Sequence, residues 1–210
     1  MSETKRPPRP LRPNAAAQSG AFIVEFALLA TFFFTVLFGV IELARVIYLF
    51  NTLQEVTRRA AHAASGTSFE KGDPAIDLVR KNAIFQDGEG ELFFGGPVTY
   101  RHIRIDYLAL KRAADNSLTL VEIPTDNLPT CPARNVFNCT MDQNNTTGKA
   151  SCIRFVRVRV CDPGKVNDCI AVNYAPLMPL IPSLSLTLPI STTIVKAETL
   201  GYTPGQAVCP

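Results

Sequence analysis

The chain has 210 residues, of which 47% are apolar and 19% are charged, and its formal net charge at pH 7 is +3. Nearly half of the residues can be buried, which excludes a chain that is disordered throughout. Residues 1–12 alone carry a net charge of +3, from one acidic and four basic side chains: Glu3, Lys5, Arg6, Arg9 and Arg12. Because the remainder is formally neutral, the sequence does not support a basic nucleic-acid-binding domain, and no nucleic-acid partner is expected.

Residues 1–20 are rich in proline and basic residues and have no hydrophobic periodicity, so we expect a disordered leader there. The sequence then becomes apolar from Ala21 to Ile41, with Glu25 as the one charged residue of this run. A helix of about 20 residues spans a bilayer core of about 30 Å. We therefore predict a transmembrane helix over residues 21–43.

A cleaved secretory signal peptide is the alternative reading of this region, with cleavage near Ala60–Ala64. The apolar stretch of such a peptide has only about 7–15 residues, and here Glu42 and Arg45 separate the apolar run from these alanines. An uncleaved span is therefore favoured. The basic residues before it predict a cytoplasmic N-terminus and an exported C-terminal part.

Helical periodicity continues beyond the span, over residues 44–65. Residues at steps of three and four form a mainly apolar stripe: Val46, Phe50, Leu53, Thr57 and Ala60. The opposite face is polar: Arg45, Asn51, Glu55, Arg58 and Arg59. Gly66 is a suitable helix end. Because the stripe is too short and too rich in alanine for a dimeric coiled coil, we expect it to pack on a sheet formed by the following residues.

Residues 66–210 combine one short helical pattern with several strand patterns. The helix is expected over residues 75–86, with Asp73 as its N-cap. Strands are expected at residues 98–110, 117–123, 153–161, 168–174 and 184–196. Residues 124–149 are expected to be a loop, and the prolines of residues 174–189 favour an extended connection. The predicted fold class is α+β, with a long N-terminal helix packed on an antiparallel sheet in an exported, disulfide-linked head.

All six cysteines lie in the C-terminal part of the chain: Cys131, Cys139, Cys152, Cys161, Cys169 and Cys209. An even number of cysteines in an exported domain predicts disulfides. An Asp-Pro-Gly turn between Cys161 and Cys169 favours a bridge across that predicted hairpin. Equal spacing would pair Cys131 with Cys139 and leave Cys152 with Cys209, but six cysteines allow many pairings and the sequence does not choose.

Neither a metal site nor a cofactor is predicted, because no Cys-x-x-Cys motif occurs and both histidines, His62 and His102, precede every cysteine. The sequence also lacks nucleophile-elbow, P-loop, His-Glu-x-x-His and dinucleotide-binding motifs, so we expect no enzyme. N-glycosylation sequons at Asn138, Asn144 and Asn145 leave open a glycosylated single-pass surface protein. Another alternative is a membrane-anchored extracytoplasmic binding or adhesion protein.

Glu25 requires an explanation, because a carboxylate in a membrane helix costs about 2.5–3.5 kcal/mol at the bilayer centre and less near its edge. Gly20 lies five residues earlier, where the basic leader meets the apolar run. Cleavage after Gly20 would create an amine at Ala21, and residues i and i+4 are neighbours on a helix. The ammonium could then pair with Glu25, within one chain or between adjacent chains. Alternatively, Gly20 only marks the helix boundary and Glu25 reaches the membrane surface.

Gly20 and Glu25, between a basic leader and an apolar helix, resemble the class III signal of type IV pilins and pseudopilins. More narrowly, GAFIVEFALLATFFFTVLFGVIELARVIY and the ending VRVRVCDPGKVNDCIAVNYAPLMPLIPSLSLTLPISTTIVKAE resemble the TadE-like (TadE/TadF) minor pilins of the Tad, or Flp, tight-adherence pilus. Residues 66–150 carry no motif of this family, and the six cysteines depart from its pattern.

The resemblance implies cleavage by a prepilin peptidase after Gly20, N-methylation of Ala21 and a role for Glu25 in assembly. It implies a minor pilin that acts in pilus initiation, in assembly or at the tip, and hence in surface adhesion. The implied partners are other minor pilins, the major pilin, the peptidase, the assembly platform and the lipid bilayer. The implied location is the bacterial inner membrane, with the head in the periplasm, or the extracellular pilus after assembly.

Overall fold

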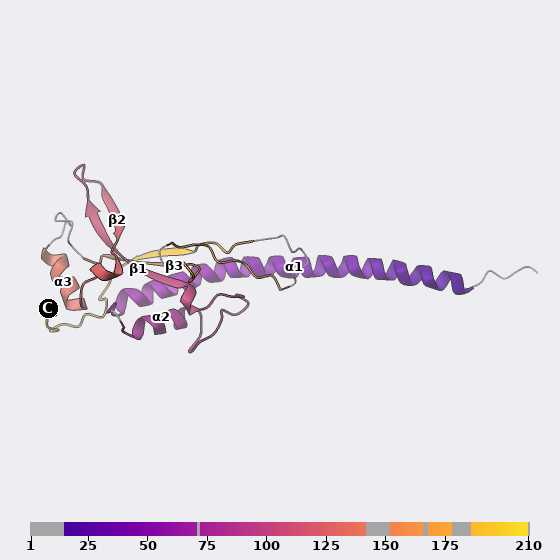
Figure 1. The fold of residues 1–210 in the computed structure, drawn as a ribbon, viewed down its shortest axis with the longest axis horizontal. Helices are drawn as coiled ribbons and strands as arrows, with labels where there is room; N and C mark the ends of the chain where they lie inside the picture. The colour runs from indigo at the N-terminus through magenta and orange to yellow at the C-terminus, as the bar shows by residue number, and fades with distance from the viewer. Residues whose placement is uncertain (1–14, 71, 142–151, 166–167, 178–185, 210) are drawn as a thin grey trace, which may run out of the picture. The chain divides into compact units, whose positions relative to one another are not determined.

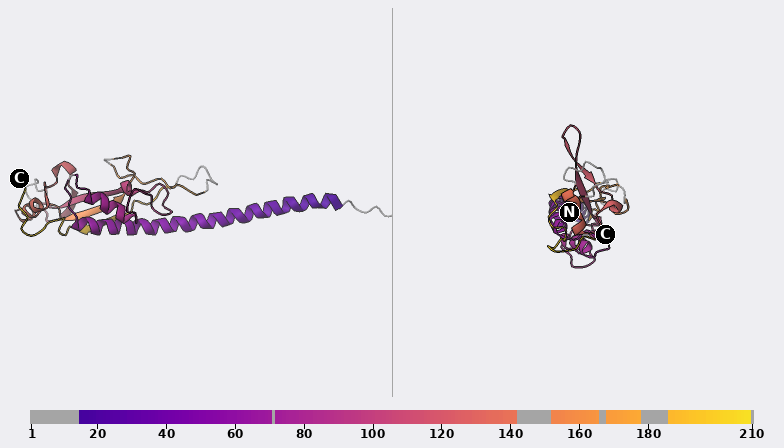
Figure 2. Two further views of the ribbon diagram at one scale, coloured as in Figure 1. Left: turned by 90° about the horizontal axis from the view of Figure 1, so that it is seen from below. Right: turned by 90° about the vertical axis from the view of Figure 1, so that its left-hand side faces the viewer.

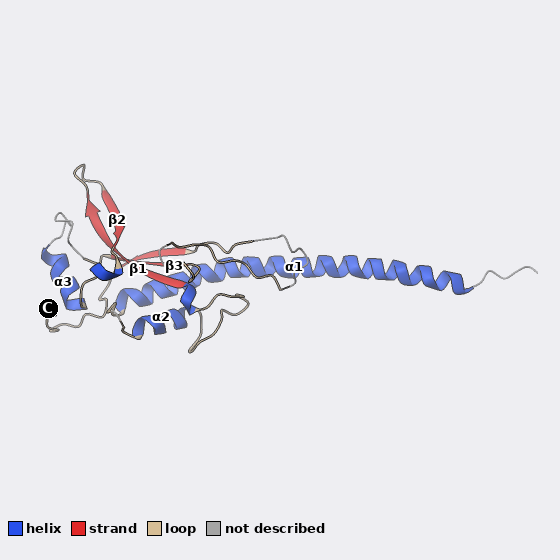
Figure 3. Cartoon of the chain, viewed as in Figure 1, coloured by secondary structure: helices blue, strands red, loops and turns tan. Residues whose placement is uncertain are grey.

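The computed structural model describes residues 15–70, 72–141, 152–165, 168–177 and 186–209. Its elements are, in chain order, α1 (Ala15–Gly66), α2 (Ala75–Ala83), η1 (Tyr100–His102), β1 (Ile103–Arg112), β2 (Leu118–Glu122), η2 (Thr125–Asn127), α3 (Pro132–Met141), β3 (Phe155–Val160) and β4 (Thr192–Lys196) (Figure 1). Within the described residues the strands form one antiparallel sheet in the order β2-β1-β3-β4. Figure 3 distinguishes the helices from the strands. The expected α+β class, with a long N-terminal helix packed on an antiparallel sheet, is confirmed.

α1 begins at Ala15, so the expectation of a disordered leader is wrong for residues 15–20, while residues 1–14 lie outside the described part. The alanines at positions 15–17 and Gln18 favour a helix, and no proline follows Pro13 to interrupt it. The chain divides into two compact units, one ending at Ala44 and the other, the head, comprising Arg45–Pro210.

The head buries one stripe of α1, in which Leu49, Leu53, Val56 and Ala60 are fully buried. The predicted stripe is correct for Leu53, Thr57 and Ala60, which are fully buried, and differs only in its first turns. Phe50 of the predicted stripe is 40% exposed, whereas Arg45 of the predicted polar face is only 8% exposed. Residues 46–50 are apolar on all sides of the helix, so their sequence alone does not determine the buried side.

The sheet packs on this stripe with the inward-facing residues of β1, β3 and β4 (Figure 2). Val156, Val158 and Val160 alternate along β3 and are essentially inaccessible to solvent, as their alternation with arginines predicts. A polar contact supplements the apolar core, because the Thr57 hydroxyl lies 3.0 Å from the Ser191 hydroxyl at the start of β4. α1 and the sheet thus share one core.

Four strand predictions correspond to observed strands, with different bounds. β2 and β3 lie within the segments predicted at 117–123 and 153–161, and β4 occupies the end of the segment 184–196, of which residues 184 and 185 lie outside the described part. The strand predicted at 98–110 is β1, which begins only at Ile103 because residues 100–102 form the short 3-10 helix η1.

The strand predicted at 168–174 is wrong for its described residues, where only an isolated bridge joins Asn173 to Thr187. The reason is that β3 has no free edge, since β1 pairs along one edge and β4 along the other. A hairpin partner for β3 therefore has no place in the sheet, and only the Asp162 N–H reaches the Ile170 carbonyl, at 2.9 Å.

The loop predicted at 124–149 is wrong for residues 125–127, which form η2, and for residues 132–141, which form α3. Pro132 occupies the first position of α3, where the missing N–H has no cost. The buried Asn135 side chain accepts the Ile153 N–H at 2.8 Å, so this asparagine joins the helix to the start of β3. Residues 142–149 of the predicted loop lie outside the described part.

The helix predicted at 75–86 is α2, which ends earlier, at Ala83. The structure places Pro74 at the N-cap position, but the Asp73 carboxylate still accepts the Ala75 N–H at 2.8 Å, which is the capping chemistry that the sequence indicates. The proline-rich connection predicted at 174–189 lies mostly outside the described residues.

Candidate functional site

The part of α1 from Gly20 to Ala44 exposes its apolar side chains on every side. None of these residues is buried, and the exposed fractions of Phe22, Phe32 and Val40 are 70%, 71% and 61%. Among the described helices, α1 is long and apolar enough to cross a membrane. A bilayer core, or a sheath of other apolar helices, would cover such a surface.

The threonines in this apolar segment satisfy their own hydrogen-bonding groups. The Thr31 hydroxyl donates to the Ala27 carbonyl at 2.8 Å, and the Thr35 hydroxyl donates to the Thr31 carbonyl at 2.8 Å. Hydroxyls bonded to the preceding helical turn add little polarity to the helix surface. Glu25 is therefore the principal polar feature between Ala21 and Ile41.

Gly20, Ala21 and Glu25 all lie within α1, at exposed positions. A side chain added at Gly20 would meet no atom within 4 Å, so the surface around this residue is open. Ala21 and Glu25 are i and i+4 neighbours on the helix. Among the described side chains, no hydrogen bond or ion pair is recorded for the Glu25 carboxylate.

The six cysteines form three disulfides: Cys131–Cys209, Cys139–Cys152 and Cys161–Cys169. The last is the bridge expected across the Asp-Pro-Gly turn. The other two differ from the pairing that equal spacing suggested. Cys131 lies just before α3 and Cys139 eight residues later within it, a rise of about 12 Å that exceeds the reach of a disulfide.

Arg45 is a buried anchor that the sequence prediction placed on the polar face. Its Nε donates to the Phe94 carbonyl at 2.9 Å, and its Nη1 donates to the Ala175 carbonyl at 2.7 Å and to the Tyr174 hydroxyl at 3.1 Å. The guanidinium also lies over the Tyr174 ring, 5.1 Å from its centroid. Arg45 thus joins α1 to two segments that are far apart in sequence. The sequence feature that could have identified Arg45 as buried is its spacing, because it lies one helical turn before the buried Leu49.

A cluster of charges occupies the sheet face opposite α1. Asp106 is buried and accepts hydrogen bonds from Arg104 at 2.9 Å, from Arg157 at 3.1 Å and from Arg159 at 2.6 Å. Glu122 of β2 pairs with the same three arginines. Each buried or half-buried charge therefore has an oppositely charged partner, and the cluster joins β1, β2 and β3.

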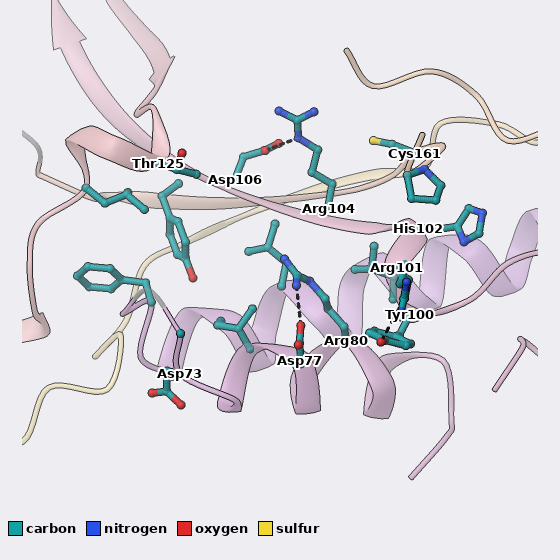
Figure 4. A pocket seen from close by; sticks show the side chains of 18 of the residues that line it. Asp73, Asp77, Arg80, Tyr100, Arg101, His102, Arg104, Asp106, Thr125 and Cys161 are labelled. Carbon is teal, nitrogen blue, oxygen red and sulfur yellow. Dashed lines mark hydrogen bonds and ion pairs between the residues drawn. The ribbon is translucent and has the colours of Figure 1, made fainter. Parts of the chain in front are cut away.

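A groove of about 990 Å³, here called the α2–β1 groove, lies between α2 and the first half of β1 (Figure 4). Arg80 of α2 donates to Asp77 at 2.7 Å, and both side chains lie on the α2 side of the groove (Figure 4). Tyr107 of β1 packs against Phe69, with ring centroids 5.7 Å apart. Burial raises the pKa of the Tyr107 hydroxyl above its usual value, and the nearby Arg80 charge only partly opposes this rise.

The two histidines lie apart from each other and from the cysteines. His62 is exposed on α1. The Nδ1 atom of His102 accepts the Thr99 N–H at 3.0 Å, and burial lowers the pKa of His102 below its usual value of 6.5. His102 therefore caps η1 as a neutral ring. Among the described residues, no group of three His, Cys, Asp or Glu side chains is arranged to hold a metal ion.

Part of α1 is similar to a known protein family. No curated protein and no solved structure matches the chain. Residues 20–62 match the family model described as TadE-like protein. The matched stretch contains Gly20, Ala21, Glu25 and Arg45 and ends before the sheet. The match confirms the predicted resemblance: residues 20–62 of the chain are similar to the TadE-like family.

Proposed function

We propose that the chain is a minor pilin, or pseudopilin, of a Tad (Flp) pilus. The observation that carries the proposal is the exposed apolar surface of α1 from Ala21 to Ile41, interrupted by Glu25 and lying inside the TadE-like stretch. Such a surface requires lipid or other helices around it. A pilin uses both in turn, because it first sits in the membrane and then packs among the helices of other pilins.

The proposed precursor has four parts. Residues 1–20 are a cytoplasmic leader, residues 21–43 the transmembrane helix, residues 44–65 its amphipathic continuation and residues 66–210 the extracytoplasmic head. The basic leader supports this orientation, since basic residues are retained in the cytoplasm. The three disulfides support a head in an oxidising compartment, here the periplasm outside a bacterial inner membrane.

The proposed processing step is cleavage of the Gly20–Ala21 bond by a prepilin peptidase, followed by N-methylation of Ala21. The open surface at Gly20 supports access to this bond. Glycine also weakens a helix by about 1 kcal/mol relative to alanine, which favours local opening near the start of α1. The new amine at Ala21 can pair with Glu25, either of its own chain or of a neighbour, and so guide assembly.

The head is proposed to act by binding rather than by catalysis. Its buried carboxylate, Asp106, is already paired with three arginines, and the sequence carries no recognised catalytic motif. The proposed partners are other minor pilins, the major pilin, the peptidase and the inner-membrane assembly platform. The proposed role is in pilus initiation, in assembly or at the tip, and hence in surface adhesion.

Fractionation of piliated cells tests this role. Filaments sheared from the cell surface should contain the chain, and this filament-associated portion should disappear when the pilus assembly motor is deleted, while the membrane-associated portion remains. An antibody to the head provides the measurement, and an inner-membrane protein unrelated to pili provides the contamination control. A chain confined to the membranes of piliated cells would instead favour a membrane-anchored adhesion protein.

A further inference from the structure

β1 has an open edge over its first half. β2 pairs with Leu108–Arg112 of β1, and Ile123 after it still donates to the Tyr107 carbonyl. Pro124 comes next, where the chain turns into η2. Proline cannot donate to a sheet, so β2 does not continue alongside the first half of β1. β3 pairs along the opposite edge of β1, from Ile103 to Leu108. Apart from the bond between Ile123 and the Tyr107 carbonyl, the edge of Ile103–Tyr107 that faces away from β3 is consequently not covered by a strand of the described sheet.

The backbone of Ile105 faces this open edge. The Cys161 N–H donates to the His102 carbonyl at 2.8 Å, so even-numbered residues of β1 face β3. The Ile123 N–H donates to the Tyr107 carbonyl at 2.9 Å, so odd-numbered residues face the other way. Alternate residues of an antiparallel strand direct both backbone groups to the same side. Among the described residues, no hydrogen bond is recorded for the N–H or carbonyl of Ile105.

Two polar side-chain atoms in the α2–β1 groove are also without partners. The Tyr107 hydroxyl and Arg80 Nε are buried atoms that make no hydrogen bond to any described residue. Tyr107 is only 8% exposed, and both residues line the groove beside the open edge. A buried polar group without a partner costs about 1–3 kcal/mol. A small shift of either side chain toward the groove would let an oxygen acceptor there satisfy its unpaired atom.

These features together specify an extended polypeptide rather than a small ligand. An anion could accept from Arg80 and Tyr107, but it could not also pair with the Ile105 N–H and carbonyl at strand spacing. An extended backbone provides an acceptor and a donor at that spacing and adds to a sheet edge. Its carbonyls or polar side chains supply the oxygen acceptors for the groove.

β2 is the segment of this chain with the complementary properties. It is an edge strand of the described sheet, and all its residues are exposed, including Leu118 at 54%, Leu120 at 43% and Val121 at 44%. The hairpin of β1 and β2 also projects from the rest of the head (Figure 1). An exposed apolar edge strand readily pairs with another chain.

We propose that the α2–β1 groove of one copy binds β2 of a second copy, which adds as a strand beside Ile103–Tyr107. The proposed contact is made in one direction, head-to-tail, and leaves a free donor and a free acceptor at the ends of each assembly. This interaction goes beyond the proposed minor-pilin function and does not depend on it.

Two proline variants test the contact from its two sides. Ile105→Pro removes the outward N–H of the groove edge, and Leu120→Pro removes the outward N–H of β2, whereas the β1–β2 and β1–β3 hydrogen bonds are made by other residues. Sedimentation velocity of the purified full-length chain in detergent should show concentration-dependent association for the wild type and at least a tenfold weaker association for each variant. Ile105→Val and Leu120→Val, which keep both N–H groups, should behave as the wild type.

Mixing the two proline variants distinguishes a lost contact from a misfolded head. Ile105→Pro retains an intact β2 and Leu120→Pro retains an intact groove, so the mixture should form one-to-one dimers at concentrations where neither variant associates measurably alone. Tyr107→Phe should weaken association about tenfold without lowering the thermal midpoint of unfolding, since it removes a hydroxyl that lacks a partner in the free head. A wild type that stays monomeric, unchanged association of the proline variants, or a mixture without dimers would overturn the proposal.

Discussion

Replacing Cys131 and Cys209 together with serine should lower the free energy of unfolding of the head by about 4–5 kcal/mol. This bridge joins the start of α3 to the C-terminal segment and closes a loop with a sequence separation of 78. A long loop loses much conformational entropy in the unfolded chain when it is closed, and the chain-entropy relation gives this magnitude at 25 °C. Denaturant unfolding of the oxidised chain, followed by circular dichroism, provides the measurement.

The Cys161–Cys169 bridge is the matched control, because its sequence separation is only 8. The same relation gives a loss of about 2.5 kcal/mol when both of these cysteines are replaced by serine. The predicted order of the two losses follows from loop length alone. A Cys161→Ser/Cys169→Ser chain that is less stable than the Cys131→Ser/Cys209→Ser chain would contradict it.

Glu25→Gln should leave membrane insertion intact and reduce incorporation into filaments at least tenfold. Removing the charge removes part of an insertion cost that is about 2.5–3.5 kcal/mol at the bilayer centre, so insertion becomes easier. Assembly should fail because the amide cannot form the proposed ion pair with the amine at Ala21. Membrane fractionation measures insertion, and quantitative blotting of sheared filaments measures incorporation.

Two further variants define the contribution of charge at this position. Glu25→Asp keeps the carboxylate on a shorter side chain and should restore part of the incorporation. Thr35→Ala changes the same helix but removes a hydroxyl that is bonded to the Thr31 carbonyl, and it should leave incorporation unchanged. Wild-type incorporation of Glu25→Gln would show that the carboxylate is only tolerated, and the assembly proposal would then be wrong.

Local periodicity predicted the elements of the head better than it predicted their partners. The period of three and four residues in α1 and the alternation of valine and arginine in β3 are properties of short segments, so the sequence shows them directly. The strand predicted at 168–174 failed because its existence depends on a free edge of β3, which β4 occupies from a distant part of the chain. Edge occupancy is a property of the whole sheet.

The candidate sites divide in the same way. Gly20, Ala21 and Glu25 follow from spacing within one helix, so the sequence is sufficient to propose them. The bonds of Arg45 to Phe94 and Ala175 and the Cys131–Cys209 bridge join residues that only the folded chain brings together. The α2–β1 groove was missed for the same reason, because it depends on where β2 ends relative to β1 and on how α2 packs beside them.

The mass of the N-terminus tests the central claim most directly. The chain should be purified from membranes of cells with and without the prepilin peptidase and its intact mass and N-terminal peptide determined. In cells with the peptidase we expect a chain that begins at Ala21, with the mass of one added methyl group, and in cells without it a chain that retains residues 1–20. A chain that begins at Met1 or Ser2 in both strains would contradict processing after Gly20 and, with it, the proposed pilin.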